Sequence, residues 1–231
     1  ITAFAQAATV TISQPAGAGA GYMPVQTINV PAGGTMSFNL TQWIDSLECK
    51  PADRVLNYGL KISSTEPVTI YYEIVSAQCL CAPTIFVLKG QNALGTDFWI
   101  PSQNWVDNGY HPGTVVNTNV MTPHPYSSFD IVATEDNTTV TILPSNPIVG
   151  HPAGVAFTVI LNQGQTYSAT AAGYLPTDRL NGSRVTSDKP IAVTYKDDML
   201  RDNSLAIFPG GCGDPGGDQL VPTPLLGTEY I

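Results

Sequence analysis

The chain has 231 residues, a formal net charge of −9 and a pI near 4.5, which argues against nucleic acid and anionic membranes as partners. Its apolar runs are far shorter than the roughly 20 residues that a membrane-spanning helix needs, so we expect no membrane insertion. Charged residues make up only 12% of the chain and hydrophobic residues 43%, which predicts a folded domain with a substantial core.

Alternation of apolar and polar residues, with many β-branched and aromatic side chains, predicts β-strands along the whole chain. Apolar residues at helical spacing are not sustained anywhere, and the best candidate for a short helix or turn is 37–49. Two prolines, Pro67 and Pro190, are expected to begin strands, where a missing N–H is tolerated. The clearest alternating runs are 8–12, 68–74, 138–142 and 191–195.

Four sequence motifs occur twice in the same order, which indicates an internal duplication. Between the matches the shift varies, so the second copy loses residues near 41–58 and gains residues near 196–217. Both changes fall in segments that we interpret as loops. The pairs are 9–12 with 139–142 (shift 130), 30–36 with 161–167 (shift 131), 62–68 with 185–191 (shift 123), and LGTDFWI at 94–100 with LGTEYI at 226–231 (shift 132).

The duplication predicts an all-β protein built from two homologous repeats. We expect a first β repeat at 1–100, a bridging loop or hairpin at 101–129 and a second β repeat at 130–231. Each repeat is interpreted as an antiparallel β-sandwich, with propeller-like four-stranded blades as the alternative. The absence of an initiator Met and the end on a strand motif lead us to expect a piece of a longer protein.

Disulfides are the default expectation for cysteines in the loops of an extracellular β-protein. Cys79 and Cys81 are only two residues apart and point to opposite faces if extended, so we do not expect them to bridge each other. Full pairing would need one bond between the repeats or a partner outside the chain. The candidates are Cys49, Cys79, Cys81 and Cys212.

Two kinds of ligand site are suggested by side-chain type. Carboxylates on a glycine-rich loop suit Ca²⁺, although their spacing fits no known calcium loop and a solvated turn is the plainer interpretation. Aromatic side chains in and around the bridge are suited to stacking on glycans, or to filling a core. The calcium candidates are Asp197, Asp198, Asp202, Asp214 and Asp218, and the glycan candidates are Trp99, Trp105, Tyr110 and Tyr126.

Local motifs in the sequence bear on glycosylation and on catalysis. Three sequons matter in a eukaryotic host, and one acidic-hydroxyl-apolar triplet suits O-glycosylation in some bacteria. A nucleophile elbow, a metalloprotease motif and a phosphate-binding loop are all missing from the sequence, so we expect a non-enzymatic protein without a cofactor other than calcium. The glycosylation candidates are Asn39, Asn137, Asn181 and Ser46.

The motifs, taken in order, resemble the IgGFc-binding-protein N-terminal domain family. The second repeat matches over nearly its whole length, while the first repeat is more divergent and has Gln6-Ala7-Ala8 in place of the Asp-Asn-Thr turn. The resemblance implies β-rich repeats in secreted mucus-associated proteins or bacterial cell-surface proteins, and it supplies no catalytic residues. The motifs lie at 129–142, 161–167, 187–193, 217–220 and 226–231.

The hypothesis is therefore an extracellular repeat module of a cell-surface adhesin or secreted fibre. Its expected partners are other surface or matrix proteins, with glycans as a further possibility. Because the chain starts and ends on strand motifs, addition of a terminal strand to a neighbour's sheet would give a homopolymer or filament. A carbohydrate-binding module and a calcium-stabilised adhesion domain are the alternatives.

Overall fold

The fold was analysed in a computed structural model, which describes residues 1–75, 83–102, 124–201 and 213–229. Strands dominate these residues, and the helices are short 3₁₀ turns. The strands are β1 (Thr2–Ala3), β2 (Ala8–Ser13), β3 (Gln26–Val30), β4 (Val55–Leu56), β5 (Lys61–Ser64), β6 (Val68–Ile74), β7 (Thr84–Leu88), β8 (Gly95–Trp99), β9 (Ser127–Ala133), β10 (Thr138–Leu143), β11 (Phe157–Leu161), β12 (Thr166–Thr170), β13 (Arg184–Arg201) and β14 (Gly213–Gln219). The 3₁₀ helices are η1 (Thr41–Ser46), η2 (Gly90–Ala93), η3 (Pro176–Asp178) and η4 (Thr223–Leu225).

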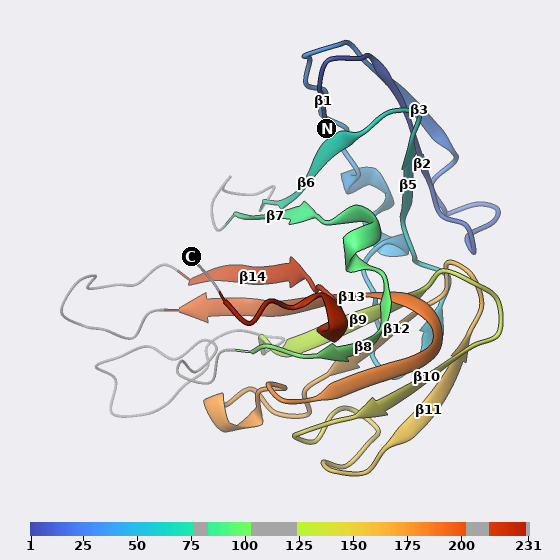
Figure 1. The fold of residues 1–231 in the computed structure, drawn as a ribbon. Helices are drawn as coiled ribbons and strands as arrows, with labels where there is room; N and C mark the ends of the chain where they lie inside the picture. The colour runs from blue at the N-terminus through green and yellow to red at the C-terminus, as the bar shows by residue number, and fades with distance from the viewer. Residues whose placement is uncertain (76–82, 103–123, 202–212, 230–231) are drawn as a thin grey trace.

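The strands form three sheets, so the predicted all-β class is confirmed (Figure 1). Two sheets have three strands each, in the orders β1-β6-β7 and β3-β2-β5. The third has eight strands and curves around a core, in the order β11-β10-β13-β9-β12-β4, with β8 and β14 also pairing with β13. The first part of β13 pairs with β10 and β8, and its last part pairs with β9 and β14.

The duplication is visible in the strand pairing itself. Each antiparallel pair of the first repeat has a counterpart in the second, in the register that the sequence shifts predict. The second repeat fuses the counterparts of β5 and β6 into the single long strand β13, with Pro190 at the change of partner. The equivalent pairs are Ala8–Val30 and Thr138–Leu161, Val10–Ser64 and Val140–Ser187, and Ala3–Val68 and Ala133–Ile191.

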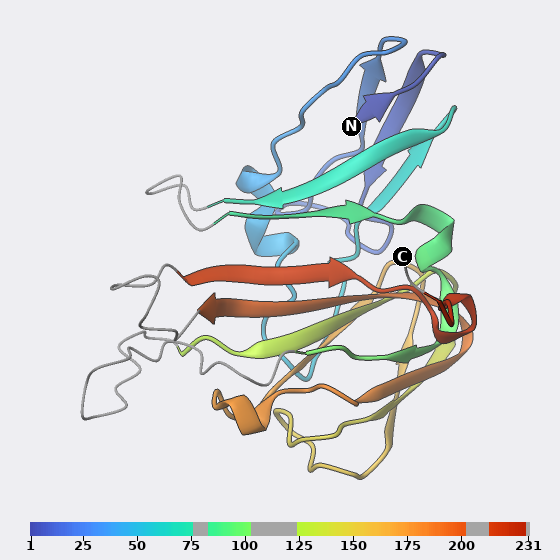
Figure 2. The same ribbon diagram turned by 60° about the vertical axis from the view of Figure 1, so that its left-hand side comes forward.

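The two repeats are not separate bodies, because the first contributes strands to the sheet of the second. β8 pairs with β13, with Phe98 opposite Val185, and β4 pairs with β12. Figure 2 shows β7 running beside β14, where the two repeats meet. The Lys89 ammonium group pairs with Asp218, and the Lys89 N–H donates to Gln219 Oε1 at 2.6 Å. The expected boundary at residue 100 therefore divides the two copies of the duplicated sequence, but strands from both sides of it belong to the same eight-stranded sheet.

The core of the second repeat is larger and better covered than that of the first. It includes Phe98 and Ile100, which come from the first repeat and are fully buried. The first repeat has a small set of fully buried side chains around Val10, Ile12 and Val30. Its other apolar side chains are only partly buried, and they are Ile1, Ile28, Phe38, Leu40, Trp43, Leu60, Ile62 and Val68.

The short helix, the β9–β10 turn and the bridge can each be compared with the sequence. The helix expected within 37–49 is η1, and Asn137 takes the positive φ (53°) that the β9–β10 turn needs. Of the bridge expected at 101–129, residues 103–123 lie outside the described part, and the last residues belong to β9.

Gly33 and Gly164 occupy equivalent turns, with φ of 66° and 76°. A Cβ on Gly33 would meet nothing within 4 Å, whereas a Cβ on Gly164 would lie 2.8 Å from the Ala16 nitrogen. We expect Gly33→Ala to lower the free energy of unfolding by about 1–2 kcal/mol from backbone strain alone, and Gly164→Ala by clearly more. Urea unfolding of both variants checks this. Equal losses would show that the contact with Ala16 has no energetic weight.

Candidate protein-binding surface

The outer face of the β6–β7 hairpin carries apolar side chains that point into solvent. In this antiparallel pair Tyr71 lies opposite Val87 and Glu73 opposite Ile85, so all four side chains share one face. Tyr71 is 54% exposed, Ile85 58% and Val87 38%. Val75, directly after β6, is also exposed. We call Tyr71, Val75, Ile85 and Val87 the hairpin face.

The other side of the same hairpin packs inward. Tyr72 lies opposite Phe86, with ring centroids 5.5 Å apart. Burial raises the pKa of the Tyr72 hydroxyl. The inner side of the hairpin therefore packs against the rest of the protein, whereas the side chains of the hairpin face are exposed to solvent.

Comparison with the second repeat shows that the fold does not require an apolar surface at these positions. The counterparts of the Tyr71–Val87 pair are Thr194 and Gln219, and Gly217 replaces Ile85. A polar or glycine-bearing hairpin thus forms the same ladder. Apolar side chains grouped and exposed on one sheet face make the hairpin face the candidate interaction site. Sequence reasoning missed this face, although apolar residues on both sides of β6 (Ile70, Tyr71, Tyr72) were a visible signal.

Of the four cysteines, only Cys49 lies in the described residues. It is a buried free thiol, and burial raises its pKa to about 12, which keeps it protonated and unreactive at neutral pH. Cys79, Cys81 and Cys212 fall outside the described residues, so pairing among these three stays a prediction.

The calcium candidates that can be placed have separate partners. Asp197 pairs with Arg179, Asp218 with Lys89, and Asp198 Oδ2 accepts the Tyr126 N–H at 3.1 Å. Within 1–75, 83–102, 124–201 and 213–229, no group of three or more His, Cys, Asp or Glu side chains is arranged to hold a metal ion. Asp202 lies outside this part, as does the side chain of Asp214, so calcium stays a sequence-based prediction that a chelator titration of the melting temperature tests.

The aromatic residues proposed for glycan contact are only partly placed. Trp99 is half-exposed at the end of β8, and the Arg184 guanidinium lies over its ring at 5.5 Å. Tyr126 makes an edge contact with Tyr174, at 6.4 Å between ring centroids. Trp105 and Tyr110 lie outside the described residues. The structure thus places one accessible indole, and does not place a row of them.

The glycosylation candidates differ in accessibility. Asn39 and Asn137 are exposed, and Asn181 is half-buried at a turn. Ser46 is only 5% exposed, and its hydroxyl group donates to the Trp43 carbonyl oxygen at 3.0 Å. The folded chain therefore presents the three sequons to solvent more readily than Ser46.

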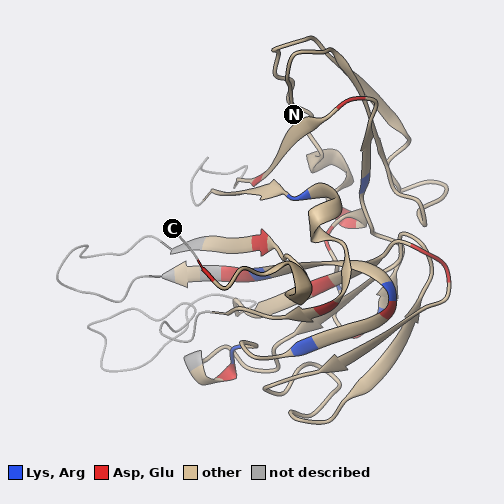
Figure 3. Cartoon of the chain, in the orientation of Figure 1, with Lys and Arg blue, Asp and Glu red and all other residues tan. Residues whose placement is uncertain are grey.

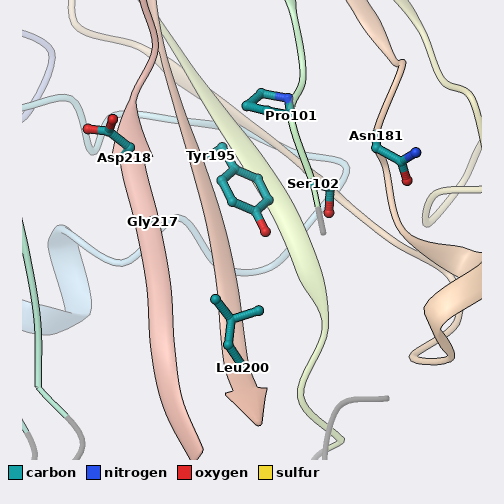
Figure 4. Close-up of a pocket in the computed structure, with 7 residues that line it drawn as sticks. All are labelled: Pro101, Ser102, Asn181, Tyr195, Leu200, Gly217 and Asp218. Carbon is teal, nitrogen blue, oxygen red and sulfur yellow. The ribbon is translucent and has the colours of Figure 1, made fainter. Parts of the chain in front are cut away.

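One open depression of about 570 Å³ lies over β13 and β14 (Figure 4). The Tyr195 ring lies in its floor, and the Tyr195 hydroxyl is 3.4 Å from Asp197 Oδ2. Burial, followed by the Asp197 charge, raises the pKa of Tyr195, so this phenol is protonated at neutral pH. Asp218 in this lining is paired with Lys89, and Asp197 beneath Tyr195 is paired with Arg179. Its lining residues are Pro101, Ser102, Asn181, Tyr195, Leu200, Gly217 and Asp218.

A second polar cluster fastens the 50–60 segment of the first repeat to the second. Asp53 Oδ1 accepts hydrogen bonds from the Tyr167 hydroxyl at 2.7 Å and from His151 Nε2 at 3.0 Å. The His151 ring stacks on Phe157, with centroids 3.5 Å apart. Asp53 itself has a φ of 57°, and its N–H donates to the Ser168 carbonyl oxygen at 3.1 Å. The arrangement holds a loop in place and orients no nucleophile.

This cluster predicts a pH dependence. Partial burial disfavours the Asp53 carboxylate, but the hydrogen bonds from Tyr167 and His151 outweigh it and lower the pKa of Asp53 below 3.8. The stabilisation is therefore present above pH 3.8 and is lost as the pH falls through the lower folded-state pKa. We expect the melting temperature of Asp53→Asn to lie below that of the wild type at pH 6, and the difference to shrink as the pH falls below 3.8. An unchanged difference across this range would contradict the assignment.

Charged side chains are sparse on both repeats, and acidic residues are spread without forming one strong patch (Figure 3). No helix in the described residues is both long and apolar enough to cross a membrane. An apolar face in a weakly charged β-scaffold suits contact with another protein better than contact with a polyanion.

These features define a β-repeat module in which the hairpin face is the candidate protein-binding surface. The family model described as IgGFc binding protein matches residues 84–231, well over half of the chain, and the chain belongs to this family. The match begins at the first residue of β7 and so includes β8 with the whole second repeat. It supports an extracellular, non-enzymatic protein-binding module. No curated protein and no solved structure matches the chain.

Proposed function

We propose that the chain is a non-enzymatic extracellular module, secreted or on the cell surface, that binds other proteins in adhesion or in the assembly of a matrix or filament. The observation that carries this proposal is the hairpin face, which is apolar and exposed and whose counterparts in the second repeat are Thr194, Gln219 and Gly217. Family membership supports protein binding as the activity. Two repeats joined by shared strands suit a load-bearing rod segment better than a flexible tether.

The hairpin face has the composition of a contact surface. It combines an aromatic anchor, Tyr71, with β-branched neighbours Ile85 and Val87 on a rigid ladder. Tyrosine is enriched among residues that dominate binding energy, because it buries a large area with few rotatable bonds. Glu73 adds one charge in the middle of the patch, which suits a partner with a basic or hydrogen-bond-donating group there.

The test is retention of beads that carry the chain on surfaces coated with immunoglobulin Fc, with a mucin, or with the chain itself. The Tyr71→Thr/Ile85→Thr variant keeps β-propensity while removing the apolar contact. We expect about tenfold or greater loss of retention, the usual effect of removing an interface anchor. Val25→Thr/Ile160→Thr, which alters two other exposed apolar side chains, serves as the matched control and is expected to behave as the wild type.

Two results would overturn the proposal. One is retention no greater than that of uncoated beads on all three surfaces. The other is full retention by the Tyr71→Thr/Ile85→Thr variant while its unfolding curve matches the wild type, since binding would then use another surface. Binding to the Fc surface alone would narrow the function to the partner that the family description names.

A carbohydrate-binding role is a second candidate, favoured by the half-exposed indole of Trp99. It predicts that Trp99→Ala abolishes retention on the mucin surface and leaves retention on deglycosylated mucin unchanged. Equal retention of Trp99→Ala and wild type on both would exclude it.

A further inference from the structure

The sheet of the first repeat has an open edge at β5. β5 pairs with β2 on one side, and no described strand pairs with its other side. Thr65 N–H donates to the Thr9 carbonyl oxygen, so in this antiparallel pair the backbone groups of Ile62 and Ser64 point away from β2. An exposed strand edge of this kind is a template for pairing with another strand.

The second repeat shows what belongs at this edge. Its counterpart of β5 is the first part of β13, and there the outer edge is occupied by β8. Trp99 lies opposite Arg184, Phe98 opposite Val185, and Asp97 opposite Thr186. Asp97 also binds Arg184 through two hydrogen bonds, of 2.9 and 3.0 Å, which fixes the register.

The chain carries a second copy of the β8 motif, and its residues match the open edge. With the shifts of 123 and 132, Lys61 replaces Arg184 and Glu229 replaces Asp97, so the pair of opposite charges recurs. Tyr230 replaces Phe98 and would lie opposite Ile62. Leu226 to Glu229 are exposed and lie outside the described strands.

The core of the first repeat also lacks what this strand would bring. Phe98 lies opposite Val185, and both side chains are fully buried in the core of the second repeat. In the first repeat Ile62, Leu60 and Val68 are only partly buried. An aromatic side chain at the position of Tyr230 would cover this side of the core. The open edge of β5, the Lys61–Glu229 pair of opposite charges and the partly buried core of the first repeat thus all suit the 226–231 segment.

We propose that β5 is an acceptor site for the 226–231 strand of a second copy of this chain, in the register in which β8 pairs with β13. Glu229 then pairs with Lys61, and Tyr230 covers Ile62. This inference deepens the assembly role proposed above and rests on it. The contact is head-to-tail, so successive copies would form an open array, or a ring where the rotation between copies closes.

Sedimentation velocity of the full chain over a concentration series tests the contact. We expect the wild type to associate, and Lys61→Glu and Glu229→Lys each to associate about tenfold more weakly, because each places like charges opposite one another. An equimolar mixture of the two variants restores opposite charges at both kinds of contact and is expected to associate as the wild type does. Thr228→Pro removes a strand N–H in an exposed segment and is expected to give monomers.

A labelled peptide of residues 222–231 gives a direct readout by fluorescence anisotropy. We expect saturable binding to the Thr228→Pro chain, whose β5 edge is free, and no binding of the same peptide with proline at position 228. If neither the Thr228→Pro chain nor the wild-type monomer binds the unmodified 222–231 peptide, the proposal is overturned. Protection of the Ile62 amide in monomers would also overturn it, because the chain would then close its own edge. Beads that carry the Lys61→Glu chain keep the hairpin face. If they are still retained on the coated surfaces while the strand contact fails, only the strand contact is wrong and the proposed function stands.

Discussion

Replacing Phe98 by alanine is expected to lower the free energy of unfolding by about 3–5 kcal/mol, the usual loss for a fully buried phenylalanine. Phe98 comes from the first repeat but is 0% exposed in the core of the second. At this chain length the loss corresponds to a fall of roughly 6–20 °C in melting temperature. Urea unfolding followed by tryptophan fluorescence and calorimetry measures both quantities.

The neighbouring residue is the control. Trp99 lies on the same strand with its side chain on the opposite face and is 49% exposed. We expect Trp99→Ala to lose clearly less than Phe98→Ala. Similar losses of unfolding free energy for Phe98→Ala and Trp99→Ala would mean that β8 does not close the second core. The inward and outward side chains of the strand would then contribute equally to stability.

The second large effect concerns the buried ion pair between Arg179 and Asp197. Arg179 follows η3, Asp197 lies in β13, and both side chains are almost wholly buried. Asp197→Ala is expected to destabilise the chain by about 3–5 kcal/mol, because it leaves a guanidinium group buried without its carboxylate. Asp218→Ala removes the half-exposed partner of Lys89 and is expected to lose about 1 kcal/mol or less.

The paired replacement Arg179→Met/Asp197→Leu separates charge burial from packing. It removes both charges and keeps most of the volume, so it is expected to recover much of the stability that Asp197→Ala loses. A loss of 1 kcal/mol or less in Asp197→Ala would contradict the assignment of this pair as a structural lock. Asp197 was a calcium candidate in the sequence, and its position against Arg179 gives it a different role.

Much of the fold followed from the sequence because duplication supplies its own comparison. The strands at β2, β6 and β10 were indicated by alternation, and the shifts of 130, 131 and 123 reproduce the observed registers. The helix η1 was indicated by the apolar residues of 37–49, a local signal of the kind that a short segment encodes.

The sharing of strands did not follow, because it depends on contacts between residues far apart in sequence. LGTDFWI was recognised as a repeated motif, yet only the structure shows it pairing with β13 rather than within its own repeat. The ion pair of Arg179 was likewise invisible, since 179 has no motif around it. The hairpin face was missed because strand prediction asks which side chains are apolar, not which side of a sheet is left uncovered.

Two positions that the duplication makes equivalent give the most direct test of this shared-strand arrangement. Ile62 in β5 and Val185 in β13 have the same backbone role, but only Val185 has a strand, β8, beyond it. The measurement is amide hydrogen exchange of the monomeric chain at these two residues. Slow exchange at Val185 with fast exchange at Ile62 is the predicted result. Equal protection at both positions would contradict the claim that one repeat completes the other and leaves its own edge open.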